Sequence, residues 1–179
     1  MTTDLNLPTL AGLEYFAYID ENGEVQSQWQ GKIGVYGIFD QDKVLQFVGY
    51  SRDVYLSLKQ HLVRQPDKCY WVKVQTIDKP SRTVLENIEN AWIAENGITP
   101  VGNGEEKVKW TQAIDTKLMM TAEERDNYEK SDDLGKGKVF KNVARRVEGE
   151  ILAVLTGRGL KTEIRFNPKL KEEGLLDLK

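Results

Sequence analysis

Few residues in this 179-residue chain are suited to acid–base or thiol chemistry. His61 is the one histidine; it follows Ser57 by four positions and Val54 by seven, so the three share one side of a helix. A histidine titrates near neutral pH and could act as a general base, but we favour a structural, hydrogen-bonded role. Cys69, the one cysteine, lies in the apolar stretch Cys69-Tyr70-Trp71-Val72, which indicates packing.

The composition is that of a folded globular protein. Apolar residues make up 40% of the chain and charged residues 30%. This length predicts one main domain of roughly 100–150 residues with an added segment. No apolar run approaches the ~20 residues that cross a bilayer, and no basic-then-apolar leader begins the chain. We therefore expect a cytoplasmic protein that does not contact membranes.

The charge is distributed unevenly along the chain. Residues 1–103 hold 9 basic and 13 acidic side chains, a net of −4, whereas residues 134–171 hold 10 basic and 3 acidic, a net of +7. This basic stretch could bind DNA or RNA, or an acidic protein partner; a solvated helix face is the slightly favoured alternative. Its candidate contact residues are Lys138, Lys141, Arg145 and Arg146.

The first part of the chain predicts a small sheet and two helices. Residues 13–19 and 24–29 flank Asn22-Gly23, which predicts an N-terminal β-hairpin within residues 1–30. A second hairpin is predicted from the β-rich runs 33–39 and 44–48. An amphipathic helix over 51–64, a strand over 70–77 and a helix from the N-cap Ser81 to Asn96-Gly97 follow.

The last part, residues 105–179, predicts a mainly helical, basic extension. Thr121 and Glu124 have capping-box spacing, so a short polar helix should run to Lys130. Residues 131–138 have the composition of a flexible linker, residues 139–156 have the apolar stripe of a helix, and residues 161–166 could form an edge strand. The overall expectation is an α+β fold.

Two tripeptides in the first part carry a resemblance to a known family. Gly34-Val35-Tyr36 and Phe47-Val48-Gly49, followed by His61, Glu89 and Pro100-Val101-Gly102-Asn103, resemble the ordered signature of the GIY-YIG nucleases. The resemblance covers residues 31–104, some two-fifths of the chain. It implies a three-stranded antiparallel sheet flanked by helices that cuts phosphodiester bonds with the help of Mg²⁺.

The resemblance also implies roles for single residues. Tyr36 matches a tyrosine proposed to take part in proton abstraction, and Gly34 and Gly49 match motif glycines. Glu89 best matches the metal-binding glutamate, with Glu86 as the competing assignment. Asn103 matches an asparagine that fixes local geometry.

Two departures from the signature indicate impaired catalysis. Phe47 replaces the second signature tyrosine and removes a hydroxyl. Ser57 stands where the resemblance places an arginine, and a neutral hydroxyl cannot clamp a phosphate. Arg52 is the best remaining cation, because Lys59 and Arg64 are expected to lie too far around or along the helix.

Aromatic side chains near the motif add a binding hypothesis. Tyr50 and Tyr55 are the candidates for exposed stacking on bases, whereas Trp71 and Trp92 fit core packing better.

Three functions are compatible with the sequence. The favoured one is a catalytically impaired GIY-YIG-like domain that binds nucleic acid or protein, without a cofactor. The alternatives are an active, divergent Mg²⁺-dependent endonuclease and an unrelated α+β interaction protein. The oligomeric state is left open.

Overall fold

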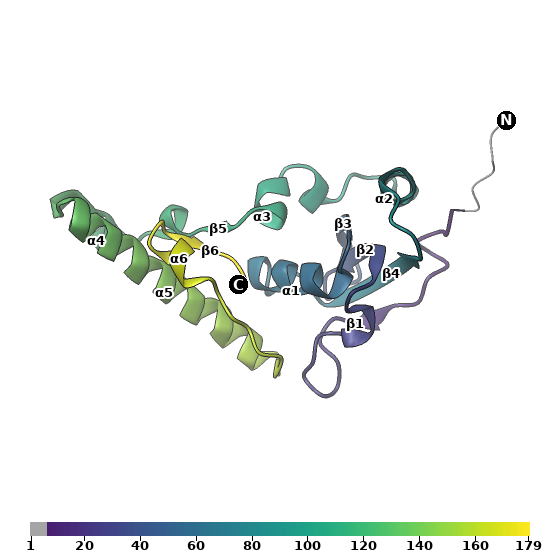
Figure 1. The fold of residues 1–179 in the computed structure, drawn as a ribbon, viewed down its shortest axis with the longest axis horizontal. Coiled ribbons are helices and arrows are strands. Elements are labelled where there is room, and N and C mark those ends of the chain that lie inside the picture. Colours follow the sequence, from purple (N-terminus) through teal and green to yellow (C-terminus); the bar gives the residue numbers. More distant parts are fainter. Residues whose placement is uncertain (1–6) are drawn as a thin grey trace. The chain divides into compact units, whose positions relative to one another are not determined.

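The chain forms two compact units of α and β structure. The computed structural model describes residues 7–179, and one unit runs to Thr111 while the other runs from Gln112 to Lys179 (Figure 1). The expected α+β class is therefore confirmed. Within residues 7–179, no helix combines the length and the apolar character needed to cross a membrane.

The first unit is built on an antiparallel sheet of four strands, one more than the resemblance implied. The strands lie in the order β1-β4-β2-β3. The predicted hairpin of β2 and β3 is confirmed, and Asp40 closes its turn by accepting hydrogen bonds from the amides of Asp42 and Val44. The four strands are Phe16–Ala17 (β1), Ile33–Phe39 (β2), Leu45–Ser51 (β3) and Trp71–Ile77 (β4).

The predicted N-terminal hairpin forms only next to its turn. The turn before Gly23 forms, with φ 78° at that glycine, but only one bridge, Ile19 to Val25, joins its two arms. Strand β1 instead pairs with β4, and residues Ser27–Trp29 form a 3₁₀ helix (η1). The physical reason is packing: Trp29 is buried with its ring edge-to-face on Phe16, at a centroid distance of 5.1 Å.

The two predicted helices of the first unit form, although α1 begins three residues later than predicted. Helix α1 (Val54–Arg64) starts after Asp53, whose carboxylate accepts a hydrogen bond from the amide of Leu56. Helix α2 (Arg82–Asn96) starts after Ser81 and ends at Gly97, which takes the left-handed conformation at φ 81°. A 3₁₀ helix, Val101–Asn103 (η2), and a short α-helix, Lys107–Thr111 (α3), follow.

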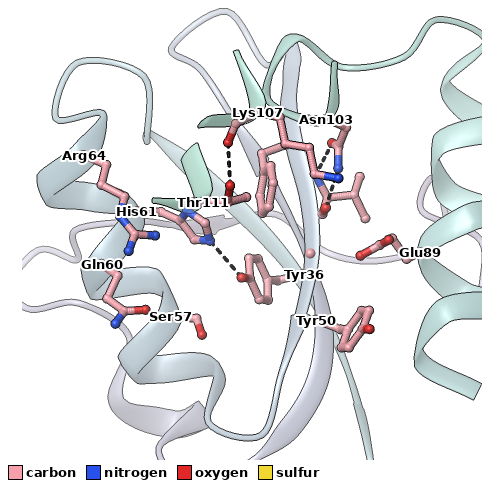
Figure 2. Close-up of a pocket in the computed structure, with 13 residues that line it drawn as sticks. Tyr36, Tyr50, Ser57, Gln60, His61, Arg64, Glu89, Asn103, Lys107 and Thr111 are labelled. Carbon is pink, nitrogen blue, oxygen red and sulfur yellow. Dashed lines mark hydrogen bonds between the residues drawn. The ribbon is translucent and has the colours of Figure 1, made fainter. Parts of the chain in front are cut away.

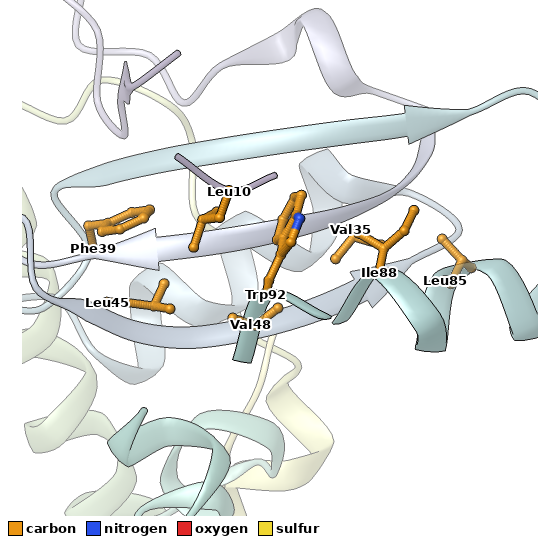
Figure 3. Close-up of a cluster of buried hydrophobic side chains, with 8 residues drawn as sticks. All are labelled: Leu10, Val35, Phe39, Leu45, Val48, Leu85, Ile88 and Trp92. Carbon is orange, nitrogen blue, oxygen red and sulfur yellow. The ribbon is translucent and has the colours of Figure 1, made fainter. Parts of the chain in front are cut away.

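Side chains alternate between the two faces of this sheet. Val35 and Val48 pack against Ile88 and Trp92 of α2 in an apolar core (Figure 3). Tyr36 is the next residue on β2 and projects to the opposite face, where its ring lies 5.5 Å from that of His61 on α1. Helix α2 therefore covers one face and α1 the other.

The outer edge of β3 is closed by one side chain. At Val48, the amide donates to Asn103 Oδ1 at 2.8 Å and the carbonyl accepts from Asn103 Nδ2 at 2.8 Å. Asn103 thus behaves as an added strand residue on the edge of the sheet. These two hydrogen bonds agree with the expected role of Asn103 in local geometry, which stays a prediction.

The second unit is mainly helical, as predicted, but its boundaries differ. The capping box at Thr121 is present and opens α4 (Ala122–Lys130). The predicted linker 131–138 is wrong, because Asp132 caps a helix, α5, that already begins at Asp133 and runs to Gly157. The predicted strand 161–166 is reduced to a single bridge from Phe166 to Leu178.

Smaller elements are Ile114–Asp115 (β5), Thr116–Met119 (η3), Pro168–Lys171 (α6) and Leu175–Leu176 (β6), with β5 and β6 antiparallel.

We expect Asn103→Ala to lower the free energy of unfolding by about 1–3 kcal/mol, because it leaves two backbone groups of the edge strand without their partner. Urea unfolding measures the change. Asn90→Ala is the matched control: Asn90 is exposed on α2, so its replacement should change stability by no more than about 0.5 kcal/mol. Equal effects of the two substitutions would contradict the role of Asn103 as an edge clamp.

Candidate ligand pocket at the edge of the sheet

The pairing of β2 with β3 places Tyr36 directly opposite Gly49. A β-carbon at position 49 would lie 2.9 Å from Tyr36 Oη and 2.6 Å from Phe47 Cε1, closer than such atoms approach. The glycine therefore leaves space beside the tyrosine hydroxyl. Gly34 serves the sheet itself, since a β-carbon there would lie 2.7 Å from the Gln75 carbonyl oxygen.

This space is part of a pocket of about 340 Å³ at the β3 edge, which we call the edge pocket. Helix α1 supplies Ser57, His61 and Arg64, which are spaced by four and three residues and so share one helix face. Figure 2 shows these side chains on one side of the strands and Glu89 of α2 on the other, with Tyr36 between them. The edge pocket thus bends around the edge strand and is lined from both faces of the sheet.

A buried pair forms the floor of the edge pocket. Tyr36 Oη and His61 Nε2 lie 2.8 Å apart, and both side chains are buried. Burial raises the pKa of the Tyr36 hydroxyl well above its usual range, while the hydroxyl of Ser57 and the charge of Arg64 oppose that rise. Tyr36 therefore holds its proton at neutral pH, which argues against the predicted role in proton abstraction.

His61 is neutral as well. Burial and the nearby Arg64 charge lower its pKa to about 3, and the Trp110 carbonyl opposes this shift. Its ring lies 4.6 Å from Phe47 and 5.8 Å from Trp110, between centroids. The favoured structural, hydrogen-bonded reading of His61 agrees with this geometry, and a general base near neutral pH does not.

Phe47 makes an aromatic wall where the signature tyrosine was expected. Its ring stacks on Trp110 of α3 with centroids 5.5 Å apart and planes 8° apart. Gly102 permits this contact, because a β-carbon there would lie 2.9 Å from Trp110 Cγ. The phenyl ring therefore closes the pocket with apolar surface and adds no hydroxyl to it.

Charged groups stand around this neutral floor. Arg64 donates from Nη1 to the Trp110 carbonyl at 3.1 Å, and Lys107 reaches the edge pocket from α3. Glu89 is half-buried on α2, and burial together with Glu86 raises its pKa, whereas Lys107 lowers it. The charged side chains that line the edge pocket are thus two cations and one carboxylate.

Glu89, and not Glu86, is the carboxylate of the edge pocket. Glu86 accepts from Arg82 at 2.7 Å and from the Tyr50 hydroxyl at 3.2 Å, and it does not line this pocket. Within residues 7–179, no three His, Cys, Asp or Glu side chains come close enough to hold a metal ion. A metal here would have one protein carboxylate, and the predicted Mg²⁺ stays a prediction.

Several predicted residues lie elsewhere. Arg52 is exposed and lies outside the edge pocket, and so does Tyr55, whose ring lies 5.4 Å from Lys59 Nζ. Ser57 does line the edge pocket, and its hydroxyl donates to Ser51 Oγ at 2.6 Å.

The predicted basic contacts lie on α5, in the second unit. Arg146 is engaged there, with its guanidinium 2.8 Å from both Glu124 and Glu150. Lys138 and Arg145 are exposed, and Lys141 is partly exposed. A nucleic acid or an acidic protein as the partner of this stretch stays a prediction.

The expectation that Arg64 lies too far along the helix to reach the site of Ser57 was wrong. Seven residues are almost two full helical turns, so Arg64 returns to the face of Ser57, and its long side chain lines the same pocket. This spacing was readable in the sequence. Lys107 carried no such signal, because its place depends on the turn after α2, which no periodicity predicts.

Comparisons with known proteins found one informative relative. No family model matches the chain. Over 74 residues the chain is 39% identical to a protein of Arabidopsis thaliana named "Bifunctional monothiol glutaredoxin-S16, chloroplastic". That segment is 39% of this chain and 25% of the relative, so the match spans about a quarter of the relative's length.

This finding corrects the expected family. The matched protein is named as a glutaredoxin and not as a nuclease, and no nuclease family model matches the chain, so we withdraw membership of the GIY-YIG nucleases. The impaired nuclease-like binding module, the active endonuclease and the unrelated interaction protein are set aside with it. The match covers too little of either protein to place this chain in the glutaredoxin family.

The neutral state of His61 predicts a pH dependence. Its pKa falls from 6.5 to about 3 on folding, so between these values the unfolded chain binds a proton that the folded chain does not. Stability should therefore be full above pH 6.5 and fall on acidification, by at most about 1.4 kcal/mol per pH unit from this group.

Urea unfolding between neutral and mildly acidic pH checks this, with His61→Gln as the comparison. Carboxylates titrate in both proteins, so only the difference between the two slopes of unfolding free energy against pH reports on His61. If the free energy of unfolding fell equally with pH in both proteins, His61 would not be held neutral.

Proposed function

We propose that the edge pocket binds a ligand through a phosphate group. The observation that carries this proposal is that Arg64 and Lys107, from two different elements, line one concave site with a single opposing carboxylate, Glu89. The charged side chains of the edge pocket carry a net charge of +1, which favours binding of an anion. The guanidinium of Arg64 is planar and donates in the fork geometry that matches phosphate oxygens.

The neutral floor supports an anion as well. Tyr36 keeps its proton because burial raises its pKa, so it brings no negative charge toward the ligand. His61 is neutral and hydrogen-bonded to Tyr36, so the positive charge of the site comes from the guanidinium and the ammonium. Binding and orientation of a phosphate group are what these residues can supply.

Mg²⁺ fits this site as a companion of the phosphate. Mg²⁺ is commonly held by one or two carboxylates together with phosphate oxygens and waters. Glu89 would be its protein ligand, and its raised pKa reflects a carboxylate that burial and Glu86 make costly to ionise, a cost that a cation would relieve. The ion would supply charge neutralisation beside the phosphate.

We expect phenyl phosphate to bind the full-length protein, with an affinity that falls as salt rises. Arg64→Gln and Lys107→Gln should each weaken binding about tenfold, because a charged hydrogen bond is lost. Lys109→Gln is the matched control: Lys109 lies on the same helix, pairs with Glu106 at 3.5 Å and does not line the edge pocket. Calorimetric titration measures all four proteins, and no binding, or equal loss in all three variants, would refute the proposal.

The role of Mg²⁺ is tested in the same titration. Mg²⁺ should tighten phenyl phosphate binding several-fold in the natural sequence and leave Glu89→Gln unaffected. Glu86→Gln is the control, since Glu86 bonds to Tyr50 and Arg82 and lies outside the edge pocket. A Mg²⁺ effect that survives Glu89→Gln would remove Glu89 as the metal ligand.

Thiol redox chemistry is a second candidate function, because the matched relative is named as a glutaredoxin. The observation that supports this candidate is the sequence identity over 74 residues. The chain itself offers one thiol, Cys69, which is fully buried and whose Sγ lies 3.6 Å from the His61 carbonyl. Thiol–disulfide exchange needs an accessible thiolate. The structure therefore favours the phosphate proposal for this chain.

A thiol reagent separates these two candidates. We expect Cys69 to react with an aromatic disulfide reagent at least about a hundredfold more slowly in the native protein than in urea, because burial blocks access. Absorbance of the released thiolate follows the reaction. Fast reaction of the native protein would restore a redox role for Cys69.

A further inference from the structure

We infer that the ligand of the edge pocket carries a second phosphate group, which lies in a neighbouring pocket beside Arg52 and Arg82. This inference rests on the proposed function and narrows its ligand to a bisphosphate. The neighbouring pocket has a volume of about 550 Å³ and lies between the end of β3 and the start of α2. We call it the arginine pocket.

Tyr50 joins the two pockets, because it lines both of them. Its hydroxyl donates to Glu86 at 3.2 Å, and its ring packs against the apolar core between β3 and α2. The ring is therefore fixed as a shared wall. A molecule that passes over Tyr50 would have one end in the edge pocket and the other in the arginine pocket.

The arginine pocket has the charge that a second anion needs. Arg52 is exposed, and among residues 7–179 no carboxylate forms an ion pair with it. Arg82 pairs with Glu86 at 2.7 Å but remains 82% exposed, so its charge faces solvent. The charged side chains that line the arginine pocket are these two arginines, and the nearby Glu86 pairs with one of them.

The apolar side chains of the arginine pocket are suited to an uncharged spacer. The arginine pocket is also lined by Ile33, Pro80 and Leu85, and the Tyr50 ring adds aromatic surface. Apolar side chains cannot replace the hydration of a charge, so a ligand charged along its whole length would lose stability there. A small molecule with a phosphate at each end and an uncharged middle fits these constraints.

A series of alkyl bisphosphates measures the span between the two sites. We expect one member among the ethane-, butane-, hexane- and octane-diyl bisphosphates to bind at least about tenfold more tightly than butyl phosphate. The second phosphate would then bind within the same complex at high effective concentration, which is greatest when the spacer matches the span. Calorimetric titration at fixed salt gives each affinity.

The double variant Arg52→Gln, Arg82→Gln should lose this tenfold gain and keep the affinity for butyl phosphate unchanged, because neither arginine lines the edge pocket. Both side chains are exposed, so the variant should fold, which circular dichroism checks. Lys79→Gln is the control, since Lys79 is an exposed cation next to Pro80 that does not line the arginine pocket.

The outcomes separate this inference from the function on which it rests. If butyl phosphate binds but no bisphosphate binds more tightly, or if the gain persists in the double variant, the second site is refuted and the edge pocket stands. If butyl phosphate does not bind at all, both proposals fall.

Discussion

The register of β2 against β3 is the constraint on which the site depends. It sets Tyr36 opposite Gly49 on the edge strand, and the missing β-carbon leaves the tyrosine hydroxyl beside open space. A shift by one residue would turn Tyr36 toward the apolar core under α2. Asn103 holds this register from outside, because it occupies the free amide and carbonyl of Val48 where a further strand would pair.

The electrostatics of the site follow from burial. Tyr36 and His61 are both removed from water, so each keeps its neutral form, and their mutual hydrogen bond satisfies two polar groups in an aromatic surrounding. Charge is confined to the longer side chains around the pocket, where water can still reach it. The result is an uncharged floor with cations at its rim, an arrangement suited to holding an anion and poorly suited to abstracting a proton.

The relation to the Arabidopsis protein concerns a segment and not the whole molecule. Identity of 39% over 74 residues indicates common ancestry for that stretch, but the stretch is only 25% of the relative, which is named as bifunctional. The buried state of Cys69 agrees with a structural role for the one thiol of this chain. Shared ancestry and a different chemistry are compatible, because chemistry resides in particular side chains placed on a fold.

By itself, the sequence determined the local structure. Asp53, Ser81, Gly97 and the Thr121 capping box set helix ends through bonds within a few residues, so their signals are readable in order along the chain. Only the tertiary structure decided the pairing of β1 with β4, the presence of Lys107 and Arg64 in one pocket, and the burial that keeps His61 neutral. These depend on contacts between residues distant in sequence, and on the loss of water around them, which no local pattern encodes.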